Sequence, residues 1–225
     1  MTGPARVTAA TPAVDEIELS DGSYFNPANP DPRAITLDNV AWALARTTRF
    51  GGSYKPSVVF YSVAEHAVLV ASKLRRLGAP LSVCMAGLHH DDAEGLNGVG
   101  DPQRPAKPLL GVEFTERDKR IDRAVWRAVG WPDRQQEMLW MTGDLHGGLV
   151  KRVDEWACRF EALHIMHSGG RNWPAGTFDD SGLPPIPTDD GDEIHAWLPP
   201  TAHDAYLSVH HGLAYAAYDW SRVTA

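Results

Sequence analysis

Residues 80–94 read PLSVCMAGLHHDDAE, and this stretch decides the fold. Leu81, Cys84 and Leu88 recur every three to four residues, the spacing that places side chains on one face of an α-helix. Asp91 follows Leu88 by three residues, so the same spacing turns its carboxylate toward the apolar face. Because an unpaired buried carboxylate is costly, the segment predicts a helix that carries a functional group into the core.

Helical periodicity extends outward from this segment in both directions. Ser62 and Glu65 have the spacing of a capping box, in which Glu65 is the reciprocal acceptor, and the helix that follows is expected to end at Gly78. Further helices are expected over residues 36–50, 113–129, 145–167 and 206–220. No strand pattern or repeat is evident. The chain is therefore predicted to be all-α, with a flexible tail over residues 1–20 and one helical bundle over residues 21–225. An irregular Pro/Asp-rich arm over residues 171–200 precedes the last helix.

Composition excludes several classes of protein. The 225 residues include 21 Lys and Arg against 29 Asp and Glu, a formal net charge of −8, which argues against nucleic acid as a partner. Two cysteines, Cys84 and Cys158, cannot build a disulfide framework and are expected to be reduced core residues. With no signal peptide and no membrane-spanning run, we expect a cytoplasmic protein without a membrane partner; a homo-oligomer is compatible with the sequence.

Metal-competent side chains lie at apolar positions of three predicted helices. His66 and Asp154 each have helical spacing to buried residues, as Asp91 does beside His90. Any one of them alone fits a hydrogen-bonded core histidine or a structural ion pair. Two imidazoles and two carboxylates converging from three helices are better explained by one divalent cation. This mixed nitrogen and oxygen set suits Mn, Co, Zn, Fe or Ni, and Mg only weakly.

Four motifs in this order resemble those of the HD-domain metal-dependent phosphohydrolases, and most closely the bacterial and phage 5′-deoxynucleotidase-like branch. They are YSVAEH at residues 61–66, LHHDDAE at 88–94, GDPQRPAK at 100–107 and VKRVDEWACRFE at 150–161. The resemblance covers residues 20–220. The chain departs from the family pattern in two places: the loop between Glu94 and Asp101 is two residues longer, and His89 replaces an apolar residue, so that His89 and His90 compete for one assignment.

The resemblance implies a role for each matching residue. It implies that His66, His90, Asp91 and Asp154 bind one metal ion. Glu94 is implied to act on the attacking water or the leaving group, and Asp101 is implied as the second acid. Arg49 is implied to contact the substrate phosphate, with Phe50 against the nucleoside.

The residues themselves suggest compatible roles. Glu94 follows His90 by four residues, one helical turn, which would bring it within reach of a water at the metal. Arg49, Arg104 and Lys107 are the local cations that an acidic protein needs to seat a phosphate, although a solvated loop explains Arg104 and Lys107 equally well.

We therefore expect an enzyme that hydrolyses a phosphate ester of a nucleotide or deoxynucleotide, with the 5′-nucleotidase reaction favoured. A (d)NTP triphosphohydrolase that releases triphosphate is the first alternative, and alarmone hydrolysis stays open. An HD-fold dinuclear oxygenase or phosphodiesterase is disfavoured, because His146 is the only histidine between Asp91 and Asp154. A non-catalytic nucleotide-binding protein is disfavoured because the expected ligands and Glu94 are all present.

Overall fold

The computed structural model describes residues 15–130, 148–171, 173 and 185–223, with backbone only from residue 217 onward. His146, the first residues of the helix expected to start at 145, and most of the first half of the expected arm lie outside the described residues.

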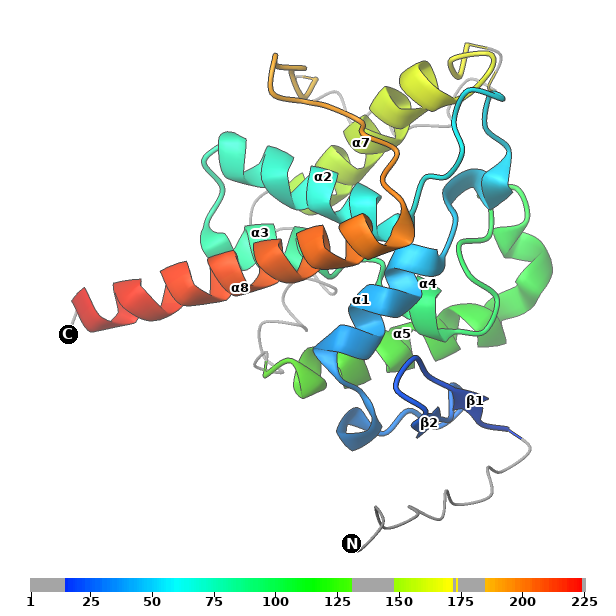
Figure 1. The fold of residues 1–225 in the computed structure, drawn as a ribbon, viewed down its shortest axis with the longest axis vertical. Helices are drawn as coiled ribbons and strands as arrows, with labels where there is room; N and C mark the ends of the chain where they lie inside the picture. Colours follow the sequence, from blue (N-terminus) through cyan, green and yellow to red (C-terminus); the bar gives the residue numbers. More distant parts are fainter. Residues whose placement is uncertain (1–14, 131–147, 172, 174–184, 224–225) are drawn as a thin grey trace, which may run out of the picture.

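The described chain is mostly helical, as predicted (Figure 1). Its only sheet among the described residues pairs two short strands, β1 (Ile17–Glu18) and β2 (Tyr24–Phe25), antiparallel to each other. The α-helices are α1 (Leu37–Arg46), α2 (Val63–Arg76), α3 (Leu81–Leu88), α4 (Asp92–Leu96), α5 (Gly111–Ala128), α7 (Leu149–Ile165) and α8 (Pro199–Val223). Short 3-10 turns occupy η1 (Pro32–Ala34), η2 (Arg49–Gly52) and η3 (Lys107–Leu110).

Helix α2 is the centre of the bundle and packs against α1, α3, α7 and α8. Its apolar residues Val63, Val70 and Leu74 are fully buried. Gly87 of α3 allows the closest approach, since a Cβ at that position would lie 2.2 Å from Leu74 Cδ1. A larger residue at position 87 would therefore force the Leu74 side chain to move.

The N-terminus of α2 has one of the two hydrogen bonds of the predicted capping box. The Ser62 hydroxyl accepts a hydrogen bond from the Glu65 backbone N–H at 3.1 Å, as expected. The Glu65 carboxylate instead accepts three backbone N–H groups, those of His195 at 2.8 Å, Ala196 at 3.0 Å and Trp197 at 2.7 Å. The expected reciprocal role of Glu65 is thus replaced by a long-range one. The physical reason is that a buried carboxylate gains more from three charge-assisted bonds than from a single cap.

Further polar contacts tie the arm before α8 to the bundle. The fully buried Lys73 ammonium lies 2.6 Å from Asp189 and 2.7 Å from Asp192, and Arg76 also pairs with Asp192. The arm has no helix or strand over residues 185–198, as expected, but α8 begins at Pro199, earlier than the predicted residue 206. Figure 1 shows α8 crossing α2 and α3, with its C-terminal end projecting from the bundle.

The first helix is shorter than predicted. It ends at Arg46, where the Thr47 hydroxyl donates to the Ala43 carbonyl at 2.8 Å. The chain then pairs with the segment before α2, through a bridge between Thr48 and Ser62 and a bond from Arg49 N to the Tyr61 carbonyl at 3.0 Å. This extended pairing replaces the last helical turn and fixes the position of Arg49.

At the other end of the domain, β1 lies within the segment expected to be a tail. Ile17 pairs with Phe25, whose side chain is buried in the core. The tail predicted over residues 1–20 is therefore too long, because an apolar strand residue there has a partner.

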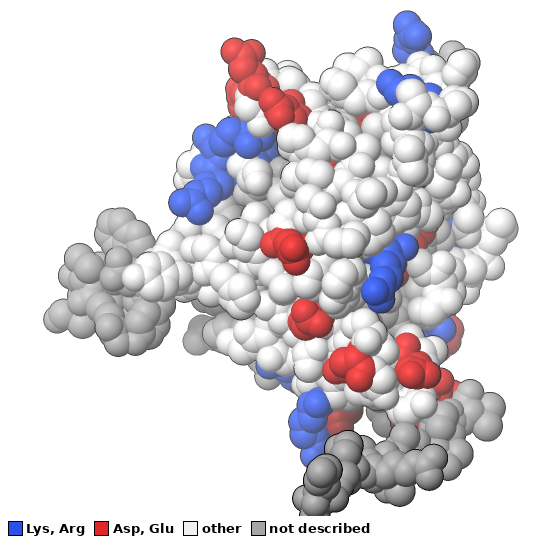
Figure 2. Space-filling model, viewed as in Figure 1, with Lys and Arg blue, Asp and Glu red and all other residues white. Residues whose placement is uncertain are grey.

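Two further observations concern the surface. No described helix combines the length and the apolar character needed to cross a membrane. On the face shown in Figure 2, Lys and Arg side chains occur in separate small groups with acidic side chains between them.

Candidate metal centre

Four side chains from three parts of the bundle meet at one point. They are the four that the sequence predicted as metal ligands: His66 on α2, His90 and Asp91 at the α3–α4 junction, and Asp154 on α7. One ligand atom from each lies within 4.8 Å of all the others. Of the described residues, only these four form a His, Cys, Asp and Glu group able to hold a metal ion.

The distances within this metal-ligand cluster suit a common ion. His66 Nε2 lies 3.3 Å from Asp154 Oδ1 and 3.6 Å from Asp91 Oδ2. His90 Nε2 lies 3.3 Å from Asp91 Oδ2, 3.6 Å from Asp154 Oδ1 and 3.3 Å from His66 Nε2. Ligand atoms that share an ion at about 2.0–2.2 Å are themselves about 3 Å apart. The cluster could therefore hold a divalent cation with little rearrangement.

Both imidazole rings are held by their other nitrogen. His90 Nδ1 donates to the Gly87 carbonyl at 2.8 Å, and His66 Nδ1 is hydrogen-bonded to the Glu161 carboxylate. Glu161 also accepts the Tyr61 hydroxyl at 3.0 Å. Bonds of this kind fix the tautomer of a metal-ligating histidine, so that Nε2 of each ring faces the cluster.

The electrostatics of the metal-free cluster favour protons in the place of a metal ion. Burial lowers the pKa of His90, but Asp91 and Asp154 outweigh that effect and raise it to about 10. The pKa of His66 is also raised, because Glu161 and Asp154 overcome burial and the charge of Arg49. The same pairs hold the pKa values of Asp91 and Asp154 below their ordinary value, despite the opposing effect of burial.

The competition between His89 and His90 is resolved by a break in the helix. Helix α3 ends at Leu88, His89 has φ −102° and ψ 14°, and α4 starts only at Asp92. His90 enters the metal-ligand cluster, whereas His89 is buried on the opposite side. There the His89 ring bonds Asp92 at 2.7 Å.

A second buried network explains this break. His89 Nε2 lies 2.9 Å from His210 Nδ1, and the Tyr206 hydroxyl donates to Asp92 at 2.7 Å. Asp122 of α5 accepts the Ala93 backbone N–H at 2.9 Å. These partners satisfy the polar groups that the break exposes, so continuous helix through residue 94 was a wrong prediction. The one-turn spacing from His90 to Glu94 was wrong for the same reason.

Arg49 lies beside the metal-ligand cluster, surrounded by carboxylates. Its Nη1 is 3.2 Å from Asp101, 3.6 Å from Asp91 and 4.0 Å from Glu94, while Nη2 is 3.4 Å from Glu161. The residue is only 7% exposed. Burial lowers the pKa of Arg49, but these four charges raise it well above its ordinary value. The guanidinium is therefore a permanent internal cation.

Glu94 and Lys107 form the next layer of the site. The Glu94 side chain is 7% exposed, its Oε1 is 3.1 Å from the half-exposed Lys107 ammonium, and its Oε2 has no hydrogen-bond partner. Burial, Asp91 and Asp101 raise the pKa of Glu94 well above its usual value, although Lys107 and Arg49 oppose them. A buried carboxylate oxygen without a partner fits a site that receives water or a ligand.

The remaining predicted site residues are distributed around this layer. Phe50 follows Arg49 in the left-handed region, at φ 52°, and its ring lies 6.1 Å from that of Trp173. Phe50 is held there because Gln103 Nε2 donates to its carbonyl at 2.5 Å. Arg104 is exposed, and its positive charge acts to lower the pKa of Lys151.

Two functional contacts were not assigned from the sequence. Glu161 lies seven residues after Asp154 on the same helical face, and that spacing indicated that both point inward. Lys151 pairs with Asp154 at 2.9 Å, an i,i+3 contact along α7.

The cluster is surrounded by several other charged side chains. Five carboxylates lie within 4.0 Å of Arg49, His66 or His90, and three basic side chains pair with them. The carboxylates are Asp91, Glu94, Asp101, Asp154 and Glu161, and the basic residues are Arg49, Lys107 and Lys151. Acidic side chains therefore outnumber basic ones around the cluster, which favours the binding of a cation.

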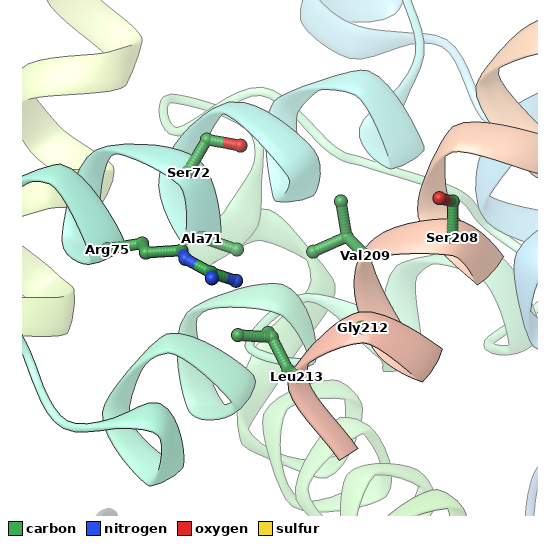
Figure 3. A pocket seen from close by; sticks show the side chains of 7 residues that line it. All are labelled: Ala71, Ser72, Arg75, Ser208, Val209, Gly212 and Leu213. Carbon is green, nitrogen blue, oxygen red and sulfur yellow. The ribbon is translucent and has the colours of Figure 1, made fainter. Parts of the chain in front are cut away.

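A surface hollow lies elsewhere, between α2 and α8 (Figure 3). It has a volume of about 240 Å³, with Arg75, Val209 and Leu213 among its lining residues. None of the residues that line it belongs to the metal-ligand cluster.

Comparison with known proteins gives little further information. No family model matches the chain. The chain is 32% identical over 116 residues to an uncharacterized protein of Rhodobacter capsulatus. The match covers 51% of this chain and 58% of that relative, so it spans little more than half of either.

Proposed function

We propose that this protein is an HD-type, metal-dependent phosphohydrolase that cleaves the 5′-phosphate ester of a nucleotide or deoxynucleotide. The observation that carries the proposal is the position of Glu94. Its buried Oε2, which has no hydrogen-bond partner, lies beside four side chains of the type and order found in the motifs that the chain resembles. Two histidines and two aspartates suit Mn, Co, Zn, Fe or Ni.

A divalent ion bound there would supply Lewis acidity and neutralise charge on the phosphoryl oxygens. The protein residues have separate tasks. Glu94 accepts a proton from the attacking water through its free carboxylate oxygen, and Lys107 holds Glu94 by its other oxygen. The water oxygen forms a bond to phosphorus, the bond from phosphorus to the ester oxygen breaks, and that oxygen takes up the proton. The products are a nucleoside and inorganic phosphate.

The cations on the chain would place the phosphate. Arg49 and Lys107 are the basic groups closest to Glu94, at 4.0 Å and 3.1 Å. Lys107 is half exposed and therefore accessible to a substrate, whereas Arg49 acts from a buried position. Phe50, beside Arg49, offers an aromatic face for the nucleoside.

The proposal is tested by incubating the full chain with nucleoside mono-, di- and triphosphates in the presence of Mn²⁺, Co²⁺, Zn²⁺ or Mg²⁺. Released phosphate, diphosphate and triphosphate are identified separately. Inorganic phosphate from monophosphates is the expected product, with no release by an Asp154→Ala variant. Triphosphate as the product would replace the nucleotidase by a triphosphohydrolase. Nucleotide binding without any release would contradict an enzymatic function.

A further inference from the structure

The guanidinium of Arg49 lies between several carboxylates beside the metal-ligand cluster. Four carboxylates approach it within 3.2–4.0 Å: Asp91, Glu94, Asp101 and Glu161. They come from separate parts of the chain, so the site is not a local acidic run. The Glu94 oxygen that pairs with Arg49, on a side chain only 7% exposed, has no hydrogen-bond partner.

Asp91 joins this place to the metal-ligand cluster. Its Oδ2 lies 3.3 Å from His90 Nε2 and 3.6 Å from His66 Nε2, and it also lies 3.6 Å from Arg49 Nη1. A carboxylate oxygen shared in this way is the usual bridge between two metal ions in a dinuclear site. Here it connects the metal-ligand cluster to a guanidinium instead.

We propose that Arg49 takes the place of a second metal ion and thereby limits this protein to one. The inference rests on the metal centre of the proposed function. The fixed guanidinium supplies the positive charge that a second ion would bring to the phosphoryl group.

The test is the number of Mn²⁺ ions bound by an Arg49→Gln variant of the full chain. Elemental analysis of the parent chain is expected to give about one ion, and the variant about two, close enough to couple as ions about 3.5–4 Å apart do. Electron paramagnetic resonance distinguishes the two states, since an isolated Mn²⁺ gives six resolved lines and a coupled pair does not.

Matched variants isolate the cause. Arg49→Lys keeps the charge and is expected to retain one ion. Lys107→Gln removes a charge that pairs with Glu94 from a half-exposed position, and it is also expected to retain one ion. The double variant Arg49→Gln with Asp101→Asn removes the carboxylate that lies nearest to the guanidinium and should return the count to one.

Each result has a distinct meaning. A parent chain that binds no Mn²⁺ would remove the proposed metal centre. A parent chain with one ion, and an Arg49→Gln variant with one ion or with two uncoupled ions, would overturn this inference alone. If Arg49→Gln is insoluble without metal, Mn²⁺ is expected to restore its folding, and failure to do so also contradicts the inference.

Discussion

Glu161 holds the ring of His66 by Nδ1, so that Nε2 of the same ring faces Asp154 at 3.3 Å. Both side chains are fully buried. The metal-ligand cluster thus depends on a residue that contributes no ligand to it, and this contact leads to the first prediction.

Replacement of Glu161 by Gln is expected to weaken Mn²⁺ binding about 10–100-fold, the usual effect of losing the partner of a ligating histidine. The amide can no longer attract the Nδ1 proton by charge, so the ring loses its fixed orientation. Isothermal titration calorimetry measures the affinity. Glu155→Gln, on the same helix and paired with Lys151 in the part of the chain that the structure describes, serves as the control and should bind normally. Equal affinities in the two variants would argue against the positioning role.

Substitutions of Asp154 and of Glu94 are expected to have different effects on metal binding and on turnover. Asp154→Ala and Asp91→Ala should lose both metal and activity, because each removes a ligand. Glu94→Ala should keep the metal and lower kcat about 10²–10⁴-fold, the range for loss of a general base. Metal content and phosphate release are measured on the same preparations. Full activity in the Glu94 variant would exclude that residue from the mechanism.

The affinity for metal is expected to rise with pH. With a pKa of about 10 in the metal-free protein, His90 is protonated at neutral pH and must lose that proton before Nε2 can bind an ion. Each released proton makes the affinity rise by up to about tenfold per pH unit below that pKa. Calorimetry in buffers with different heats of ionisation counts the protons. An affinity that does not change between about pH 6 and 9 would contradict the prediction.

The contribution of His90 to the stability of the metal-free protein should fall as the pH rises, whereas the affinity for metal should increase. A pKa raised from 6.5 to about 10 means that the charged His90 stabilises the fold fully below pH 6.5. That contribution is lost as the pH rises through about 10. Urea unfolding of metal-free protein at several pH values measures it, with His90→Asn as the control that should lack this part of the pH dependence.

Lys73→Ala is expected to lower the free energy of unfolding by about 2–4 kcal/mol, because it leaves the buried Asp192 with Arg76 as its remaining cation. The affinity for Mn²⁺ should stay unchanged, since Lys73 contacts none of the ligands. Arg75→Ala, an exposed position on the same helix, should change stability by no more than about 0.5 kcal/mol. A loss of stability from Lys73→Ala as small as that of the control would contradict the prediction.

Sequence periodicity was sufficient to predict the helical class, and helical spacing turned His66 and Asp154 toward the point where the cluster lies. For Asp91 the same reasoning assumed a helix that ends at Leu88 in the structure, and His90 was assigned from the family motifs. Glu161 could have been assigned a partner by the same reasoning, since it lies two helical turns after Asp154.

The break between α3 and α4 could not be predicted, because its cause is distant in the chain. His89 is 117 residues from Tyr206 and 121 from His210, and the local sequence contains neither Pro nor Gly at the break. Glu65 was misassigned for a similar reason, since its partners are 130–132 residues away. Local patterns describe propensity, whereas these two features depend on tertiary partners.

The three backbone hydrogen bonds to Glu65 have a consequence for folding during synthesis, because their donors are translated late. Glu65 and the ligand His66 are consecutive residues, yet the N–H groups that satisfy Glu65 belong to residues 195–197. Helix α2, the α3–α4 junction and α7 therefore emerge from the ribosome before the backbone N–H groups that bind the Glu65 carboxylate. The buried surroundings of His66 are thus completed only after the arm has been translated.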